Sequence, residues 1–351
     1  MFSLIKKLLG KSSSSEASIE SPGENNSPDQ SVESTSNEST LQKADVKSIA
    51  KEKSASPPPV KKKYSVYGNC QADPLGNILR TNDEFAAQWE FVQFPKPSFA
   101  LRAEDWADVE KLMGELDLFI TQNVGESHGI FSSDNLAKQM KPGADVIRIP
   151  NAYFSGYMPE VVYFRAGEPH VTKFCDYHDE NFLAYFMEDP VHAVEKAVAA
   201  AQNTSTYSAE FVLQNAQTSI DELKRREEEC DVIVSDYIEA NWKDDILFYS
   251  MNHPKRKVLS HLASQILNKL NQRTTSLKGN YEHLDNTRLP VYKSVKDLLN
   301  GHIEWQLSVG RQEIELEHYY QGHAKVLRAV EPDFLRNAYK QFLNVRRQTN
   351  S

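Results

Sequence analysis

Short apolar runs alternate with longer amphipathic stretches in the part of the chain that follows residue 60. The runs lie at 64–67, 89–94, 116–121 and 145–149, and the stretches between them at 73–80, 104–115 and 132–139. Short apolar runs are typical of buried strands, and apolar positions three and four residues apart are typical of helices. A strand and a helix in turn at this spacing predict βαβ units, and therefore an α/β fold with a parallel, doubly wound sheet.

The second half of the chain has mostly helical spacing of its apolar positions. Helices are expected at 191–202, 209–230, 257–270, 291–299, 305–320 and 334–345. Two short apolar segments, 231–234 and 246–249, can return to the sheet as strands. The pattern therefore predicts a largely helical C-terminal half.

The first 60 residues have a different composition from the rest. Residues 11–60 contain 14 serines and no aromatic side chain, so they cannot bury enough apolar surface to offset the entropy of ordering. We expect a disordered Ser-rich linker there. Residues 1–10 either fray or form a short amphipathic helix that touches a membrane or a partner. The predicted organisation is thus 1–10, 11–60, and an α/β catalytic domain with a helical C-terminal part at 61–351.

Charge and cysteine content exclude several classes of protein. Among the 351 residues, 40 are basic and 49 acidic, and the net charge of −9 argues against a nucleic-acid partner. No stretch approaches the roughly 20 apolar residues of a membrane span. Three scattered cysteines are too few for a disulfide framework, so a cytoplasmic location is expected. Hydride transfer and ATP hydrolysis are disfavoured because the chain has neither a dinucleotide fingerprint nor a phosphate-binding loop.

The first candidate site follows the first expected strand. Gly68 permits a tight turn, and Cys70 comes next, on the first turn of an expected helix. A helix N-terminus lowers the pKa of a thiol, and Asn69 and Gln71 can add amide donors for an oxyanion. The alternative is a buried cysteine that packs under the sheet.

The second candidate site contains a histidine at a strand-to-helix junction. Pro254 fits the first helical turn, so His253 is expected beside the edge of the sheet. There it can act as a general base for Cys70 or for the hydroxyl of an acceptor, and Asn252 can contact an oxyanion or substrate.

A basic run follows this histidine directly. Lys255, Arg256 and Lys257 oppose the helix macrodipole, which a bound polyanion would explain better than stability does. The alternative for both features is a surface histidine beside a solvated basic cluster.

Other polar residues follow the expected strand that ends at residue 121. Gln122 and Asn123 can hold an oxyanion or substrate, and His128 can act as a second base or orienting group, unless the segment is an ordinary polar loop. The segment 176–180 alternates acids with a histidine, but neighbouring side chains point apart, so no metal site is expected. Residues 153–158 are aromatic enough to stack on a sugar or adenine ring, or to form core.

Two short motifs carry a family resemblance. Residues 68–71 (Gly-Asn-Cys-Gln) and 252–254 (Asn-His-Pro) resemble the WcbI-like capsular polysaccharide biosynthesis proteins, over roughly residues 64–271. Tyr177 and Asp179 match the same family. The resemblance implies a protein of surface-polysaccharide assembly that binds coenzyme A or acetyl-CoA and moves an acetyl group to a sugar hydroxyl. Carried over by motif, the site residues are Cys70, Gln71 and His253, with Gly68 and the basic run at the cofactor.

The arrangement also resembles the SGNH hydrolases, whose sheet is flavodoxin-like. This chain differs in having Cys70 in place of serine, and Ser250 in place of the acid three residues before His253. Three hypotheses follow: an acetyltransferase acting on a carbohydrate acceptor, a glycan esterase that uses Cys70 and His253, or a non-catalytic scaffold. In the last, the N-terminal segment would contact a membrane or a glycan-assembly complex.

Overall fold

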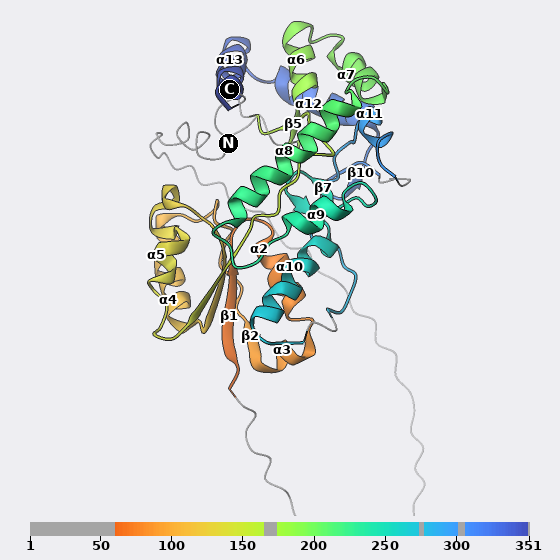
Figure 1. The fold of residues 1–351 in the computed structure, drawn as a ribbon. Coiled ribbons are helices and arrows are strands. Elements are labelled where there is room, and N and C mark those ends of the chain that lie inside the picture. The colour runs from red at the N-terminus through yellow and green to blue at the C-terminus, as the bar shows by residue number, and fades with distance from the viewer. Residues whose placement is uncertain (1–59, 165–173, 274–276, 301–305, 350–351) are drawn as a thin grey trace, which may run out of the picture. The chain divides into compact units, whose positions relative to one another are not determined.

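Four parallel strands form the central sheet of the computed structural model in Figure 1. They are β1 (Lys62–Tyr67), β2 (Trp89–Phe91), β3 (Leu118–Gln122) and β4 (Asp145–Ile149), in the order β2-β1-β3-β4. The structure describes residues 60–164, 174–273, 277–300 and 306–349. The chain moves outward from β1 in one direction to β2, and then crosses to β3 on the other side of β1. The predicted α/β fold with a doubly wound, flavodoxin-like sheet is confirmed, and the reversal falls between β1 and β3.

The strands β1 and β3 contribute alternate side chains to two separate cores. Val66 and Ile120 belong to one hydrophobic cluster, whereas Tyr67 and Phe119 belong to the other. This follows from the two-residue period of a strand. Both faces of β3 are consequently buried, which explains why its sequence shows a continuous apolar run.

Helices cover both faces of the sheet. On one face, α2 (Ala72–Leu79) and α10 (Arg256–Lys269) contribute to the larger cluster, and on the other, α4 (Trp106–Glu115) and α5 (Ser133–Ala137) contribute to the smaller one (Figure 1). Two further elements near the sheet were not predicted. They are α3 (Asp83–Gln88) and the 3-10 helix η1 (Ala103–Asp105).

The second half is largely helical, as predicted. Its helices are α6 (Glu180–Glu188), α7 (Ala193–Gln202), α8 (Ala209–Glu227), α9 (Ser235–Asn241), α11 (Lys293–Lys296), α12 (Leu316–Arg328) and α13 (Pro332–Thr349). Three antiparallel strand pairs lie outside the main sheet: β5 (Val161–Val162) with β6 (His178–Asp179), β7 (Phe248–Ser250) with β8 (His253–Pro254), and β9 (Ser308–Val309) with β10 (Gln312–Glu313). Among the described residues, no helix is both long and apolar enough to cross a membrane.

Several secondary-structure predictions made from the sequence were wrong. Residues 231–234 form no strand; Asp231 instead pairs with Arg148 of β4 through its backbone and its carboxylate before the chain enters α9. The apolar run near 248 pairs locally with β8, not with the main sheet. Within the helix expected at 305–320, residues 308–313 form the β9–β10 hairpin, and the helix α12 begins only at Leu316. The predictions for residues 1–59 lie outside the described residues, and the domain boundaries stay predictions.

Candidate functional site

The candidate site lies at the carboxyl ends of β1 and β3, where the strand order reverses. Gly68 follows β1, and the side chain of Gln122 packs directly against its backbone. A Cβ atom at Gly68 would lie 2.3 Å from Oε1 of Gln122. Glycine is therefore needed at this position because of a close approach between two chain segments.

Three amide side chains join the loops behind this turn. The backbone N–H of Asn69 donates to Oε1 of Gln122 (2.9 Å), and its Nδ2 donates to Oδ1 of Asn151 (2.9 Å). Nε2 of Gln122 donates to Oε1 of Gln71 (3.3 Å). The amides of Asn69 and Gln122, predicted to hold an oxyanion or substrate, are thus engaged with other protein groups.

Gln71 is the centre of this network. Its buried Nε2 lies within hydrogen-bond distance of Oδ1 of Asn151 (3.0 Å) and of the carbonyl oxygens of Ala152 (2.8 Å) and Asn252 (2.9 Å). An amide nitrogen has only two hydrogens, so nothing remains for a ligand. In this structure Gln71 holds together the loops after β1, β4 and β7, and its predicted catalytic role stays a prediction.

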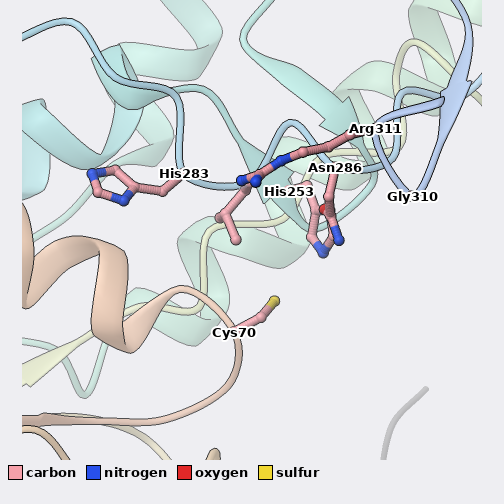
Figure 2. A pocket seen from close by; sticks show the side chains of 7 residues that line it. Cys70, His253, His283, Asn286, Gly310 and Arg311 are labelled. Carbon is pink, nitrogen blue, oxygen red and sulfur yellow. The ribbon is translucent and has the colours of Figure 1, made fainter. Parts of the chain in front are cut away.

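Cys70 and His253 line one cavity, although the sequence alone could not bring them together. The cavity has a volume of about 420 Å³, and Figure 2 shows the Cys70 sulfur directed into it. The ring of His283 points away from Cys70 in the same view. The lining residues are Cys70, His253, His283, Leu284, Asn286, Gly310 and Arg311. A pocket of this size is typical of small-molecule sites.

The thiol is not activated in the way the sequence suggested. Cys70 lies in the turn before α2, which begins at Ala72 with Gln71 as its N-cap. Burial raises the pKa of Cys70 to about 11, and a backbone hydrogen bond opposes this only partly. The expectation of a thiol pKa lowered by the helix start was wrong, because desolvation of the buried thiol outweighs the backbone hydrogen bond.

His253 is a neutral imidazole at physiological pH. It lies in β8 and not, as expected, directly before a helix; Pro254 is in the same strand, and α10 begins at Arg256. Burial lowers the pKa of His253 to about 4, and hydrogen bonding to the Leu284 backbone opposes the shift. A neutral imidazole can accept a proton, which is the state that a general base requires.

Tyr177 contacts both motifs of the site. Its hydroxyl donates to Oδ1 of Asn252 (2.6 Å), and its ring meets that of His253 edge to face, with 5.7 Å between ring centroids. The hydroxyl of the buried Ser250 also lies 3.3 Å from Oδ1 of Asn252. Asn252 therefore anchors Tyr177, and its predicted contact with an oxyanion or substrate stays a prediction. Motif resemblance was the only signal for Tyr177 in the sequence.

The three side chains of the basic run, Lys255, Arg256 and Lys257, have separate partners. None of the described residues that line the cavity belongs to the basic run. Arg256 is buried and donates to the carbonyl of Lys278 (2.6 Å), while Lys257 forms an ion pair with Asp245. Lys255 lies over the ring of Tyr249 (5.3 Å). The predicted contact of these three side chains with the phosphates of the cofactor stays a prediction.

Two further candidates lie elsewhere. The exposed Asn123 donates to Glu229 (3.0 Å) and accepts from Arg148 (3.1 Å), and His128 lies in the 3-10 helix η2 (Glu126–Phe131). Neither lines the cavity. Their predicted contact with substrate is not supported by this placement.

The segments 176–180 and 153–158, which the sequence also singled out, make structural contacts in this chain. Asp179 caps α6 and accepts from the hydroxyls of Tyr292 and Tyr320, each at 2.7 Å. Most of the aromatic segment at 153–158 is buried core, in agreement with the simpler of its two interpretations.

The fold and the cavity place this chain in the class of doubly wound α/β proteins that bind a ligand where the strand order reverses. The family model for the polysaccharide biosynthesis enzyme WcbI matches residues 63–275, more than half of the chain. The chain therefore belongs to the WcbI family, and its role is in polysaccharide biosynthesis.

A solved structure of WcbI is similar to this chain. It has a TM-score of 0.70 and 25% sequence identity, and the match covers 82% of this chain and 96% of that chain. That structure is described as the native protein without a disulfide bond between coenzyme A and one of its cysteines. No curated protein matches the chain.

Proposed function

We propose that this chain transfers an acetyl group from acetyl-CoA to a hydroxyl group of a carbohydrate. The observation that carries the proposal is the shared cavity of Cys70 and His253. The similar WcbI structure is described in terms of coenzyme A and a cysteine. In the part of the chain that the structure describes, Cys70 is the cysteine that lines this cavity.

The protonation states favour direct transfer. Because the pKa of Cys70 is about 11 and that of His253 about 4, a thiol beside a neutral imidazole is the stable pair at neutral pH. His253 takes the proton of the acceptor hydroxyl as its oxygen attacks the thioester carbonyl. The carbon–sulfur bond breaks, the acetyl ester forms, and the proton passes from His253 to the departing thiolate of coenzyme A. Cys70 then has a positional role.

The hydroxyl of Tyr163 replaces the amides as a candidate donor to the carbonyl oxygen, because the hydrogen of the Tyr177 hydroxyl is already donated to Asn252. The rings of Tyr163 and Tyr177 lie 5.4 Å apart, and a negative charge on Cys70 would raise the pKa of both tyrosines. Both tyrosines therefore lie within electrostatic range of the Cys70 sulfur. A hydroxyl held in a buried site stabilises developing negative charge strongly.

The test combines binding and turnover. Titration calorimetry with coenzyme A should show binding by the wild type, by Cys70→Ala and by His253→Asn. Release of free coenzyme A from acetyl-CoA, with a panel of sugars and sugar nucleotides as acceptors, should fall by roughly 10²–10⁴ in His253→Asn, because general-base catalysis contributes about that factor. The half-buried Cys230, which is not among the cavity-lining residues, supplies the control Cys230→Ala.

Cys70→Ala separates the two chemical routes. Turnover within about tenfold of the wild type supports direct transfer, whereas complete loss together with an acetyl adduct on wild-type Cys70 in mass spectrometry would establish the covalent route. Failure of the folded protein to bind coenzyme A would overturn the transferase and favour the esterase or the scaffold.

A further inference from the structure

The two walls of the cavity come from different parts of the chain. Cys70 and His253 lie within the stretch matched by the family model, residues 63–275. The opposite wall, which we call the 283–311 wall, follows that stretch and consists of His283, Leu284, Asn286, Gly310 and Arg311. A wall outside the matched stretch can adapt to the ligand without changing the reacting groups.

Arg311 reaches this wall from an unusual backbone position. Gly310 (φ 61°) and Arg311 (φ 66°) form the two-residue turn of the β9–β10 hairpin. Positive φ at both positions gives a turn whose twist matches the flanking strands, and glycine or asparagine is the usual choice there. A long side chain costs free energy at positive φ, and such costs tend to persist where a ligand is bound.

The guanidinium of Arg311 is held at the cavity without being buried. Its Nη2 donates to the hydroxyl of Tyr281 (2.9 Å), and its backbone N–H donates to the carbonyl of Asn286 (2.7 Å). Its side chain remains 59% exposed. Figure 2 shows Arg311 extending across the side of the cavity that faces Cys70.

Basic and acidic side chains both lie near Arg311, and Glu282 acts on Lys255 and Tyr249 alongside Arg288 and Asp285. Asp285 is shared between Arg311 (3.7 Å) and Arg288 (3.3 Å), so one carboxylate serves two guanidinium groups. Nε of Arg288 is buried without a hydrogen-bond partner among the described residues. Arg288 and Lys255 both lie over the ring of Tyr249, at 5.4 and 5.3 Å. Arginine pairs well with the planar, bidentate geometry of phosphate oxygens.

We propose that the 283–311 wall binds the phosphate groups of the ligand that enters the Cys70 cavity, with Arg311 as the direct contact. Arg288 and Lys255 supply supporting charge. Phosphate can come from coenzyme A, in which case the inference rests on the proposed function, or from a nucleotide-activated sugar acceptor. The wall then selects ligands by their phosphates, while Cys70 and His253 act on the reacting group.

Titration calorimetry on the full chain tests this with three probes: coenzyme A, pantetheine, which has no phosphate, and a nucleoside diphosphate sugar. Arg311→Gln should weaken binding of at least one phosphate-bearing probe about tenfold or more and leave pantetheine unchanged. Arg336→Gln is the matched control, because Arg336 is an exposed arginine of α13 that pairs with Asp333.

Arg311→Gly provides a second readout that a merely structural role would not give. Glycine relieves the positive φ, so the variant should unfold at a higher temperature than the wild type while it loses the same binding as Arg311→Gln. The inference is overturned if both variants bind coenzyme A and the nucleotide sugar as the wild type does, or if pantetheine binding falls equally. If the wild type binds no coenzyme A but Arg311→Gln loses the nucleotide sugar, the proposed function fails and this inference stands.

Discussion

The contact between Gly68 and Gln122 makes a strong prediction for Gly68→Ala. The new Cβ would lie 2.3 Å from Oε1, 2.6 Å from Cδ and 2.8 Å from Cγ of Gln122. All three distances are too short, so the Gln122 side chain must leave its place. The backbone N–H of Asn69 then loses its acceptor, and Gln71 loses a donor.

The magnitude follows from these two losses. Overpacking in a tight site costs about 1–3 kcal/mol, and leaving a buried N–H without a partner costs a further 1–3 kcal/mol or so. We expect the free energy of unfolding to fall by roughly 2–5 kcal/mol, measured by urea denaturation followed by tryptophan fluorescence. Binding of coenzyme A should weaken as well, because the Asn69–Gln71 turn carries Cys70.

A glycine-to-alanine substitution elsewhere in the chain should change the free energy of unfolding in the opposite direction. Gly114 lies in α4, and a Cβ there would meet nothing within 4 Å. Gly114→Ala should therefore stabilise the protein by up to about 1 kcal/mol, because alanine loses less conformational entropy in a helix. The reasoning is refuted if Gly68→Ala unfolds at the same urea concentration as the wild type. It is also refuted if the cost is undiminished in a Gln122→Ala background, where the clash is gone.

Three further predictions concern buried polar groups. Burial and the charge of Asp179 raise the pKa of Glu160, so the wild type should lose stability relative to Glu160→Gln as the pH rises from about 4.5 towards 8; parallel urea curves at pH 5 and pH 8 would contradict this. The pKa of His253, lowered from 6.5 to about 4, should cost the wild type stability as the pH falls through that interval, and His253→Asn should remove this loss in thermal unfolding scans. Asn82→Ala removes the cap of α3 and a 2.8 Å bond to the Arg273 carbonyl, so we expect a loss of about 2 kcal/mol in urea denaturation, with the cap partly retained in Asn82→Asp.

The sheet could be predicted because its strands carry their own signal. A strand such as β3 is buried on both faces and reads as a continuous apolar run. The run at 231–234 looks similar, but its conformation depends on a contact between Asp231 and Arg148 of β4. The local sequence does not reveal that contact. The β9–β10 hairpin was mistaken for a helix because Arg311 occupies a turn position where glycine or asparagine would have been recognised.

The candidate site was predicted where its residues follow strands in short motifs. Cys70 and His253 were found in this way, and the structure places both at one cavity. The opposite wall was not found, since Asn286 and Arg311 are ordinary polar residues until tertiary packing brings their loops opposite β1. Gln71 had the right residue type for an oxyanion donor, yet only the structure shows that its amide is already occupied.

Burial acts on Cys70 and His253 in opposite directions, and this bears on the choice of route. It raises the pKa of the acid and lowers that of the base, so proton transfer from thiol to imidazole becomes less favourable than in water. Enzymes that use a thiolate nucleophile depend on the reverse arrangement, a low thiol pKa beside a cation. An acetyl thioester is uncharged and cannot restore that arrangement when it enters the cavity. The charges of the 283–311 wall lie with Arg311 and Arg288, where they would meet phosphates and not the sulfur of Cys70. Burial therefore keeps the thiol protonated, which argues against Cys70 as the nucleophile and leaves the sugar hydroxyl as the attacking group.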